Sequence, residues 1–520
     1  MRRVAGAIAL ALLIYARSAQ AQAMSADILI TGGTVYDGSG APGRRADVAL
    51  RADRIVFVGD SKTANMTAAR TIDATGLIVA PGFIDPHTHT QTDLSSAARR
   101  TNLDYIMQGV TTVATNNDGS GPVGVGAVLA KWDSTGIGTN ALLFVPQGSV
   151  RSAVMGMSDK APTAPQLAQM NALVERGMRE GAFGLSTGLY YAPGSYSKTD
   201  EVIELAKVAA AHGGIYDTHQ RDESSYTIGL LASVREVLQI GREAHIPVHF
   251  SHIKALGADV WGDADTVIAM IHAAQRDGLT VAACQYPYNA SGTSLVSALV
   301  PRWAEAGGRD SLLARIAAPS THARLVSEMR ENLRRRGGAG AMLITNSRQR
   351  DLEGKRLDAI ATARGAEPVE AAMQIIRTVG DQSVASFNMN AKDIDTFMRA
   401  DFVTTCSDGS DGHPRKYGTF PRKIREYVLD RQVITMQRAI AASSAQAARD
   451  LQIVERGKLT AGWFADVIVF DPKTIRDLAT YERPELLAAG MRWVFVNGKA
   501  AVEEGRPTRV LAGRALRLAH

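Results

Sequence analysis

The chain of 520 residues is long enough for one large domain and a smaller one. Its hydrophobic content of 45% and charged content of 21% are ordinary for a globular protein and exclude extensive disorder. The net charge of +6 includes three arginines within the first 23 residues. The one dense basic run, Arg334-Arg335-Arg336, is expected to be a solvated helix end. No nucleic-acid partner is therefore predicted.

Residues 1–23 are expected to be a signal peptide. Two arginines precede an apolar run over residues 4–15, and AQAQA at residues 19–23 offers cleavage sites after small residues. The apolar run is shorter than the roughly 20 residues that span a bilayer, so a membrane anchor is disfavoured. The sequence therefore predicts an exported protein, periplasmic or secreted, with no stable membrane span.

Short β-type runs separated by glycine-rich turns occupy both flanks of the remaining chain. Residues 24–80 alternate such runs with turns, and the same texture returns over residues 451–520. Breaks at this spacing are typical of β-sandwich pieces.

Between these flanks, over residues 81–450, apolar strands alternate with helical stretches such as residues 95–109. Alternating βα units predict a parallel sheet, and an α/β fold of the (β/α)8 TIM-barrel type fits the size. Eight candidate strands can be counted: 82–89, 111–118, 141–146, 181–187, 214–219, 247–252, 280–288 and 401–409. More than a hundred residues separate the last two, which predicts an inserted subdomain over about residues 295–385.

Histidines stand at the carboxyl ends of three of these strands. His87 and His89 end the first strand two residues apart, so the alternation of side chains along a strand points both rings to one face. His219 ends the fifth strand, His252 ends the sixth, and Asp408 follows the eighth. Each alone has an ordinary interpretation as a cap, a surface residue or a turn. Together, at the end of a barrel where active sites lie, they are ligands that suit Zn²⁺.

Longer motifs cover nearly the whole chain after the signal peptide: APGFIDPHTHTQTDL, GVTTVATNNDG, GAFGLSTGLYYAPGSY, THQRDE, SHIKALG, YPYNASGTS, SDGSDGHPRKYGTFPR and RGKLTAGWFADVIVFDP. Together they resemble the D-aminoacylase (N-acyl-D-amino-acid deacylase) family of the amidohydrolase superfamily. The resemblance implies a (β/α)8 barrel with a small β-sandwich domain built from both chain ends. It also implies zinc as cofactor and hydrolysis of N-acyl-D-amino acids to a carboxylate and a D-amino acid.

The resemblance implies roles for individual residues. His219 and His252 match the histidines that hold a tightly bound zinc, and His87 and His89 match the pair that holds a second, weaker metal.

The remaining matches concern catalysis and substrate binding. Asp408 matches the catalytic aspartate, which is expected to accept a proton from water and to donate it to the departing nitrogen. Lys254, Tyr286 and Arg415 match residues that bind the substrate carboxylate.

Two positions depart from the family pattern. Asp118, within the stretch 116–119 (Asn-Asn-Asp-Gly), stands where characterised members have a cysteine ligand. A carboxylate ligates Zn²⁺ singly or as a bridge but is harder than a thiolate, which leaves open one or two metal ions and a divalent metal other than zinc. A plain turn is the alternative interpretation of this stretch. Gly292 stands where some relatives have serine, which leaves fine substrate choice open.

Other functions stay open at this point. An exported amidohydrolase that acts on another amide, such as a dipeptide or an N-acylated xenobiotic, is one alternative. A non-catalytic scaffold is another, and the retained histidines and Asp408 disfavour it. No lysine ends the fourth strand, which disfavours a hydantoinase-type enzyme. The sequence does not set the substrate side chain, the acyl group, the strictness for D over L, or the oligomeric state.

Overall fold

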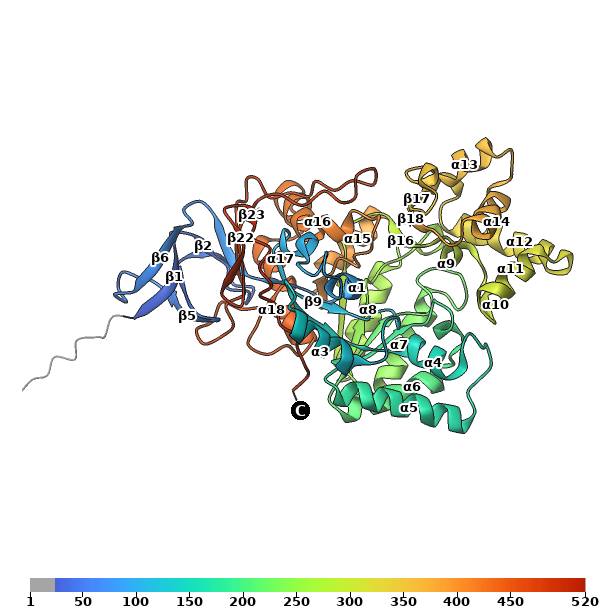
Figure 1. Ribbon diagram of the computed structural model, residues 1–520, viewed down its shortest axis with the longest axis horizontal. Coiled ribbons are helices and arrows are strands. Elements are labelled where there is room, and N and C mark those ends of the chain that lie inside the picture. The colour runs from blue at the N-terminus through green and yellow to red at the C-terminus, as the bar shows by residue number, and fades with distance from the viewer. Residues whose placement is uncertain (1–23, 520) are drawn as a thin grey trace, which may run out of the picture.

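The structure, a computed structural model, describes residues 24–519. The expected signal peptide lies outside the described residues. Across residues 24–519, no helix is both long enough and apolar enough to cross a membrane. Figure 1 shows a β-rich part in blue and dark red at one end of the long axis, a barrel in the middle, and a yellow and orange part at the other end.

A closed parallel barrel forms the centre of the molecule. Its hydrogen bonds run in two arcs, β8–β9–β10 and β11–β12–β13–β14–β15–β19, because the third strand is interrupted at Phe144. Thr88 pairs in parallel with Gly409, and the amide of Asp408 donates to the carbonyl oxygen of His87 (3.0 Å), which closes the ring. The (β/α)8 barrel is thus confirmed. Its strands are β8 Phe83–Asp85, β9 Val110–Thr115, β10 Asn140–Leu143, β11 Val145–Pro146, β12 Gly184–Gly188, β13 Ile215–His219, β14 Val248–Phe250, β15 Val281–Gln285 and β19 Val403–Thr405.

Helices surround the barrel, each with one apolar face turned inward. In α7, for example, the buried residues Val234, Val237 and Leu238 follow the spacings of three and four that place side chains on one helix face. The helices that connect consecutive strands are α3 Val125–Thr135, α4 Gln147–Met155, α5 Ala164–Arg179, α6 Thr199–Ala211, α7 Leu230–Ala244 and α8 Ala264–Arg276.

The helix expected over residues 95–109 is wrong as a continuous element. Within it only α2 Leu103–Ile106 is helical, and turns precede it. The cause is Asn102, whose backbone is left-handed (φ 53°), a conformation that an α-helix of L-residues does not accommodate. Its buried side chain accepts a hydrogen bond from Thr90 (2.8 Å) and donates one to Thr139 (3.0 Å). Tertiary contacts therefore override the local helical preference.

Two packed sheets form the smaller domain. The first has the order β5-β4-β1-β6 and the second the order β23-β22-β21-β20-β7-β2-β3. In the second, β20 runs antiparallel to β7 with Val467 opposite Pro81, so the two chain ends hydrogen-bond directly. The strands are β1 Ser25–Thr31, β2 Thr34–Val35, β3 Arg44–Arg45, β4 Asp47–Arg51, β5 Arg54–Gly59, β6 Thr67–Asp73, β7 Ile78–Pro81, β20 Val467–Phe470, β21 Met491–Val496, β22 Lys499–Glu503 and β23 Arg506–Pro507.

Between β15 and β19 the chain builds an outlying unit, which we call the insertion and which spans residues 291–386. An antiparallel sheet of order β16-β18-β17 and six helices enclose its own hydrophobic cluster. In Figure 1 it lies at the end of the molecule away from the β-rich domain. Its elements are β16 Ser291–Ser294, α9 Leu295–Leu299, α10 Arg302–Glu305, α11 Arg309–Ala317, α12 Pro319–Arg335, β17 Met342–Asn346, α13 Leu357–Ala363, α14 Pro368–Thr378 and β18 Ser383–Ser386.

The basic run at the end of α12 is only partly solvated. Arg334 is exposed, as expected, but Arg336 is buried at 3% exposure. Its guanidinium donates to the carbonyl oxygen of Ala298 (3.2 Å) and to the hydroxyl of Tyr190 (3.1 Å). The expectation of a solvated helix end is therefore wrong for Arg336, because acceptors distant in sequence satisfy its charge inside the protein.

Candidate metal centre and active site

Four histidines surround one aspartate at the C-terminal ends of the barrel strands. Oδ1 of Asp118 lies 3.4 Å from Nε2 of His87 and 3.5 Å from Nε2 of His252. The same oxygen lies 3.8 Å from Nδ1 of His219, and Oδ2 lies 3.5 Å from Nε2 of His89. The structure brings all five predicted metal ligands together, with Asp118 at the centre.

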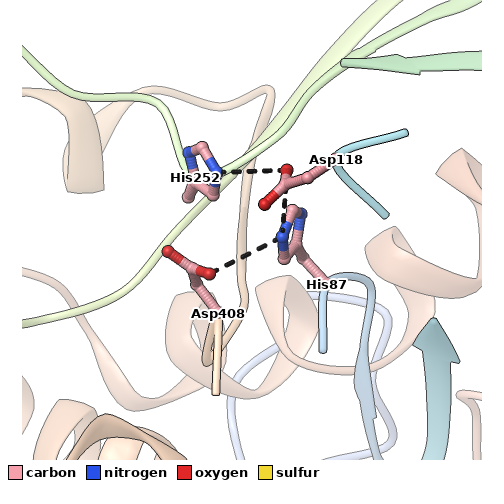
Figure 2. Close-up of side chains that lie close together, drawn as sticks. All are labelled: His87, Asp118, His252 and Asp408. Carbon is pink, nitrogen blue, oxygen red and sulfur yellow. Dashed lines mark ion pairs between the residues drawn. The ribbon is translucent and has the colours of Figure 1, made fainter. Parts of the chain in front are cut away.

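Asp408 faces this cluster from the end of β19. In Figure 2 dashed lines join its carboxylate to His87, His87 to Asp118, and Asp118 to His252. Oδ1 of Asp408 lies 3.1 Å from Nε2 of His89 and 3.7 Å from Nε2 of His87. Asp408 therefore stands next to the five predicted metal ligands.

The donor atoms of the cluster are suited to a cation. His87 is fully buried, yet neither of its ring nitrogens makes a hydrogen bond, and Oδ1 of Asp118 makes none. Buried polar atoms nearly always have a partner. One ligand atom each of His87, Asp118, His252 and Asp408 lie within 4.8 Å of one another. Imidazole nitrogens and carboxylate oxygens gathered in this way fit Zn²⁺ or a similar divalent ion.

The charges of the clustered side chains also favour a bound divalent cation. Burial lowers the pKa of His219 to about 4, so this imidazole is neutral near pH 7, as a metal ligand must be. Burial opposes the ionised form of Asp118, but the facing rings of His87 and His252 hold its pKa well below the usual value. Burial opposes ionisation of Asp408 too, and the Arg415 guanidinium outweighs it, so that pKa is also low. Burial opposes protonation of His87 and His252 as well, but nearby carboxylates outweigh it: the pKa of His87 is raised beside Asp118, and that of His252 to about 10 beside Asp408 and Glu223. A divalent cation would replace these protons as the positive partner of the two ionised carboxylates.

The backbone is strained at three positions of the site. Asp118 (φ 56°), His252 (φ 32°) and Asp408 (φ 48°) all have positive φ, which costs non-glycine residues free energy. Such strain persists where surrounding contacts impose it and is concentrated at functional sites. Here the positive-φ conformations direct the three side chains toward the same cluster.

Asp217 of β13 supplies one of these contacts from beneath the cluster. Its buried carboxylate accepts hydrogen bonds from Asn117 (2.9 Å) and Ser251 (3.0 Å), the chain neighbours of Asp118 and His252. The stretch around Asp118 is therefore a turn in its backbone, but one anchored so that the Asp118 carboxylate faces the histidines.

The three residues expected to bind a substrate carboxylate also lie together. The guanidinium carbon of Arg415 lies 4.7 Å from the ring centre of Tyr286, and Nζ of Lys254 lies 5.6 Å from it. Arg415 is 1% exposed, its Nε has no hydrogen-bond partner, and its Nη1 lies 2.7 Å from Oδ2 of Asp408. Arg415 therefore retains hydrogen-bonding capacity for an anion beside Asp408.

Glu223, which was not among the predicted site residues, also belongs to the site. Its Oε1 lies 2.7 Å from Nζ of Lys254 and 3.2 Å from Nδ1 of His252. Its Oε2 lies 3.7 Å from Nε2 of His219. A carboxylate behind a ligating imidazole fixes its tautomer and orientation. The sequence signal was an acidic residue four positions after His219 in THQRDE.

A cavity of about 500 Å³ opens onto the cluster. His89, Asp118, Asp408 and Arg415 form its inner wall, and the loops after the strands and the insertion form the rest. This volume suits a small organic substrate.

Comparison with known proteins agrees with this geometry. Residues 70–502 match the amidohydrolase family. A D-aminoacylase of Alcaligenes xylosoxydans xylosoxydans is 34% identical over 96% of this chain and 99% of its own length. A crystal structure of D-aminoacylase matches with a TM-score of 0.81 at 32% identity, over 95% of this chain and 100% of that chain. The N-acyl-D-glutamate deacylase of Bordetella bronchiseptica, solved with zinc and a phosphonate inhibitor, matches over the same shares with a TM-score of 0.79 at 30% identity.

Barrel and cluster together define a metal-dependent amidohydrolase. The chain belongs to the D-aminoacylase group of the amidohydrolase family, as its motifs predicted.

Replacing Asp118 tests its place in the metal centre. Asp118→Asn keeps the shape and tolerates positive φ, but it removes the negative charge, so we expect zinc affinity to fall by at least about tenfold, as the loss of even an outer-shell partner costs about 10–100-fold. Competition with a chelator and metal analysis of the purified protein measure this. Asp411→Asn is the control, because Asp411 lines the same cavity but pairs with Arg99. Unchanged zinc affinity in Asp118→Asn would favour the interpretation of a plain turn.

Proposed function

We propose that this protein hydrolyses N-acyl-D-amino acids to a carboxylate and a free D-amino acid, with zinc as cofactor. The observation that carries the proposal is a single cavity that joins the Asp118–histidine cluster to Asp408 and to a buried arginine with unused donors. Relatives named for this activity support the same substrate class.

Two groups of residues would hold metal. His219, His252 and Asp118 would hold the principal zinc. His87, which faces the same Asp118 oxygen, and His89, which faces the other one, would hold a second ion. When bound, zinc supplies Lewis acidity that polarises the amide carbonyl and makes water acidic enough to attack at neutral pH. Glu223 holds the outer nitrogens of His219 and His252 in place.

Asp408 moves the proton. Its ionised carboxylate accepts a proton from the attacking water as the new carbon–oxygen bond forms. It then donates that proton to the amide nitrogen as the carbon–nitrogen bond breaks, so the leaving group departs as a neutral amine and Asp408 is ionised again. Its contact with His89 at 3.1 Å holds the carboxylate at the edge of the cluster.

Arg415 positions the substrate. A guanidinium binds a carboxylate through two parallel hydrogen bonds, and the Tyr286 ring supports its plane. Lys254 lies on the same ring but is paired with Glu223, so its charge contributes attraction while its position stays fixed. Holding the carboxylate here places the scissile amide next to Asp408.

We also propose that the protein is exported to the periplasm or secreted, on the basis of the signal-like pattern of residues 1–23. Expression in a bacterial host should yield a protein whose mass corresponds to a chain that begins near Met24, recovered outside the cytoplasm. Recovery of the full-length chain from the cytoplasm alone would contradict export.

The proposed activity is tested with purified zinc-loaded protein on paired substrates. We expect hydrolysis of N-acetyl-D-amino acids and at least tenfold lower kcat/KM on the L-enantiomers. Removal of the metal with a strong chelator should abolish the activity, and added zinc should restore it. Activity that survives complete metal removal, or a preference for L-substrates, would contradict the proposal.

Two substitutions separate catalysis from substrate binding. Asp408→Asn should retain zinc but lower kcat by at least about 100-fold, because general acid–base catalysis contributes about 10²–10⁴-fold. Arg415→Lys should instead raise KM by about tenfold or more, because it loses a charge-assisted hydrogen-bond pair. Steady-state kinetics and metal content measure both. A near-normal kcat in Asp408→Asn would remove the proton-transfer role.

A further inference from the structure

The lining of the active-site cavity is chemically uniform away from the metal centre. Glycine, serine and threonine provide most of its wall. Ser149 and Ser152 of α4 line it from the barrel, and Ser294 and Ser297 line it from the insertion. Hydroxyl groups donate to and accept from neutral polar groups, and they leave a full negative charge uncompensated.

Positive charge in this lining is confined to one place. Among the described residues that line the cavity, Arg415 is the only lysine or arginine. Its guanidinium faces Asp408 at 2.7 Å, and under the proposed function it binds the α-carboxylate. A second carboxylate on the substrate would therefore find no cation in the wall. The lining also holds a further acidic residue, Asp411, whose carboxylate is already paired with Arg99 and Lys416.

The buried cations nearby are not available either. Lys254 is paired with Glu223 at 2.7 Å. Arg336 donates to Ala298, Ser386 and Tyr190, and the space it adjoins has a volume of about 20 Å³. That volume holds at most a single water. The donors of Arg336 are thus engaged within the protein, in a space too small for a substrate carboxylate.

We infer that the substrate side chain is neutral: the protein acts on N-acyl-D-amino acids with uncharged side chains and discriminates against the glutamate and aspartate derivatives. The inference rests on the proposed function and narrows its substrate class. The physical reason is that a carboxylate moved from water into a site without a countercharge loses solvation that hydroxyl groups do not replace. Overall sequence identity does not decide between these substrates, because the solved D-aminoacylase and the solved N-acyl-D-glutamate deacylase are 32% and 30% identical to this chain.

A pair of substrates that differ only in charge tests the inference. N-acetyl-D-glutamine and N-acetyl-D-glutamate have nearly the same shape, and N-acetyl-D-asparagine and N-acetyl-D-aspartate form a second such pair. With the zinc-loaded protein at pH 7.5, we expect kcat/KM to be at least tenfold higher for each amide than for its acid. Inhibition by the products D-glutamine and D-glutamate gives an independent measure of binding, and D-glutamine should bind more tightly. Equal or higher kcat/KM for the acids would overturn the inference.

A change of charge in the wall provides the matched test. Ser152 is exposed on α4 and lines the cavity, and Ser152→Arg adds the missing cation. Ser152→Gln is the control, since it adds a long side chain without charge. Ser152→Arg should lower the glutamine-to-glutamate ratio of kcat/KM at least threefold relative to Ser152→Gln, and an unchanged ratio would overturn the inference. Failure to hydrolyse any N-acyl-D-amino acid would instead overturn the proposed function itself, so the two failures are distinguishable.

Discussion

The carboxylate of Asp118, placed among four imidazoles, is the interaction on which the site depends. Its Oδ1 faces His87, His219 and His252, and its Oδ2 faces His89. Oδ1 of Asp118 and both ring nitrogens of His87 are buried without a hydrogen-bond partner, an arrangement that buried polar groups rarely keep. The barrel brings the aspartate and the histidines together, because strands distant in sequence end at the same rim and the residues after them are held in strained backbone conformations.

Around this centre lie two ion pairs with different roles, Lys254–Glu223 and Arg415–Asp408. Lys254 and Glu223 lie behind the histidines, where they pair with one another and both contact Nδ1 of His252, so they set ring orientation. Arg415 and Asp408 lie at the cavity and are less completely bonded, so they are free to exchange partners when an anion enters. The insertion completes the cavity with hydroxyl groups, which confines cationic recognition of the substrate to one end.

Much of the fold and of the candidate site was predictable, for reasons that particular elements make clear. The eight strands are short apolar runs, and their periodicity survives in the sequence whatever surrounds them. The histidines were recognisable because they stand at the ends of those runs. Asn102 and Arg336 were misjudged, because a left-handed asparagine and a buried arginine depend on partners such as Thr139 and Tyr190 that lie far along the chain. Glu223 was missed because its role exists only through contact with Lys254 and His252.

The sequence by itself determined the architecture, the family and the set of candidate ligands, since these follow from local periodicity and from residue types at strand ends. The tertiary structure alone decided how those residues act. It placed the Asp118 carboxylate, which lies in a turn, at the centre of the histidine cluster. It paired Lys254 with Glu223 behind the histidines and Arg415 with Asp408 at the cavity, and it left Arg415 as the one arginine among the described residues of the cavity wall. The reason is physical: a charge acquires its function from the partners and the solvent around it, and only folding brings those partners together.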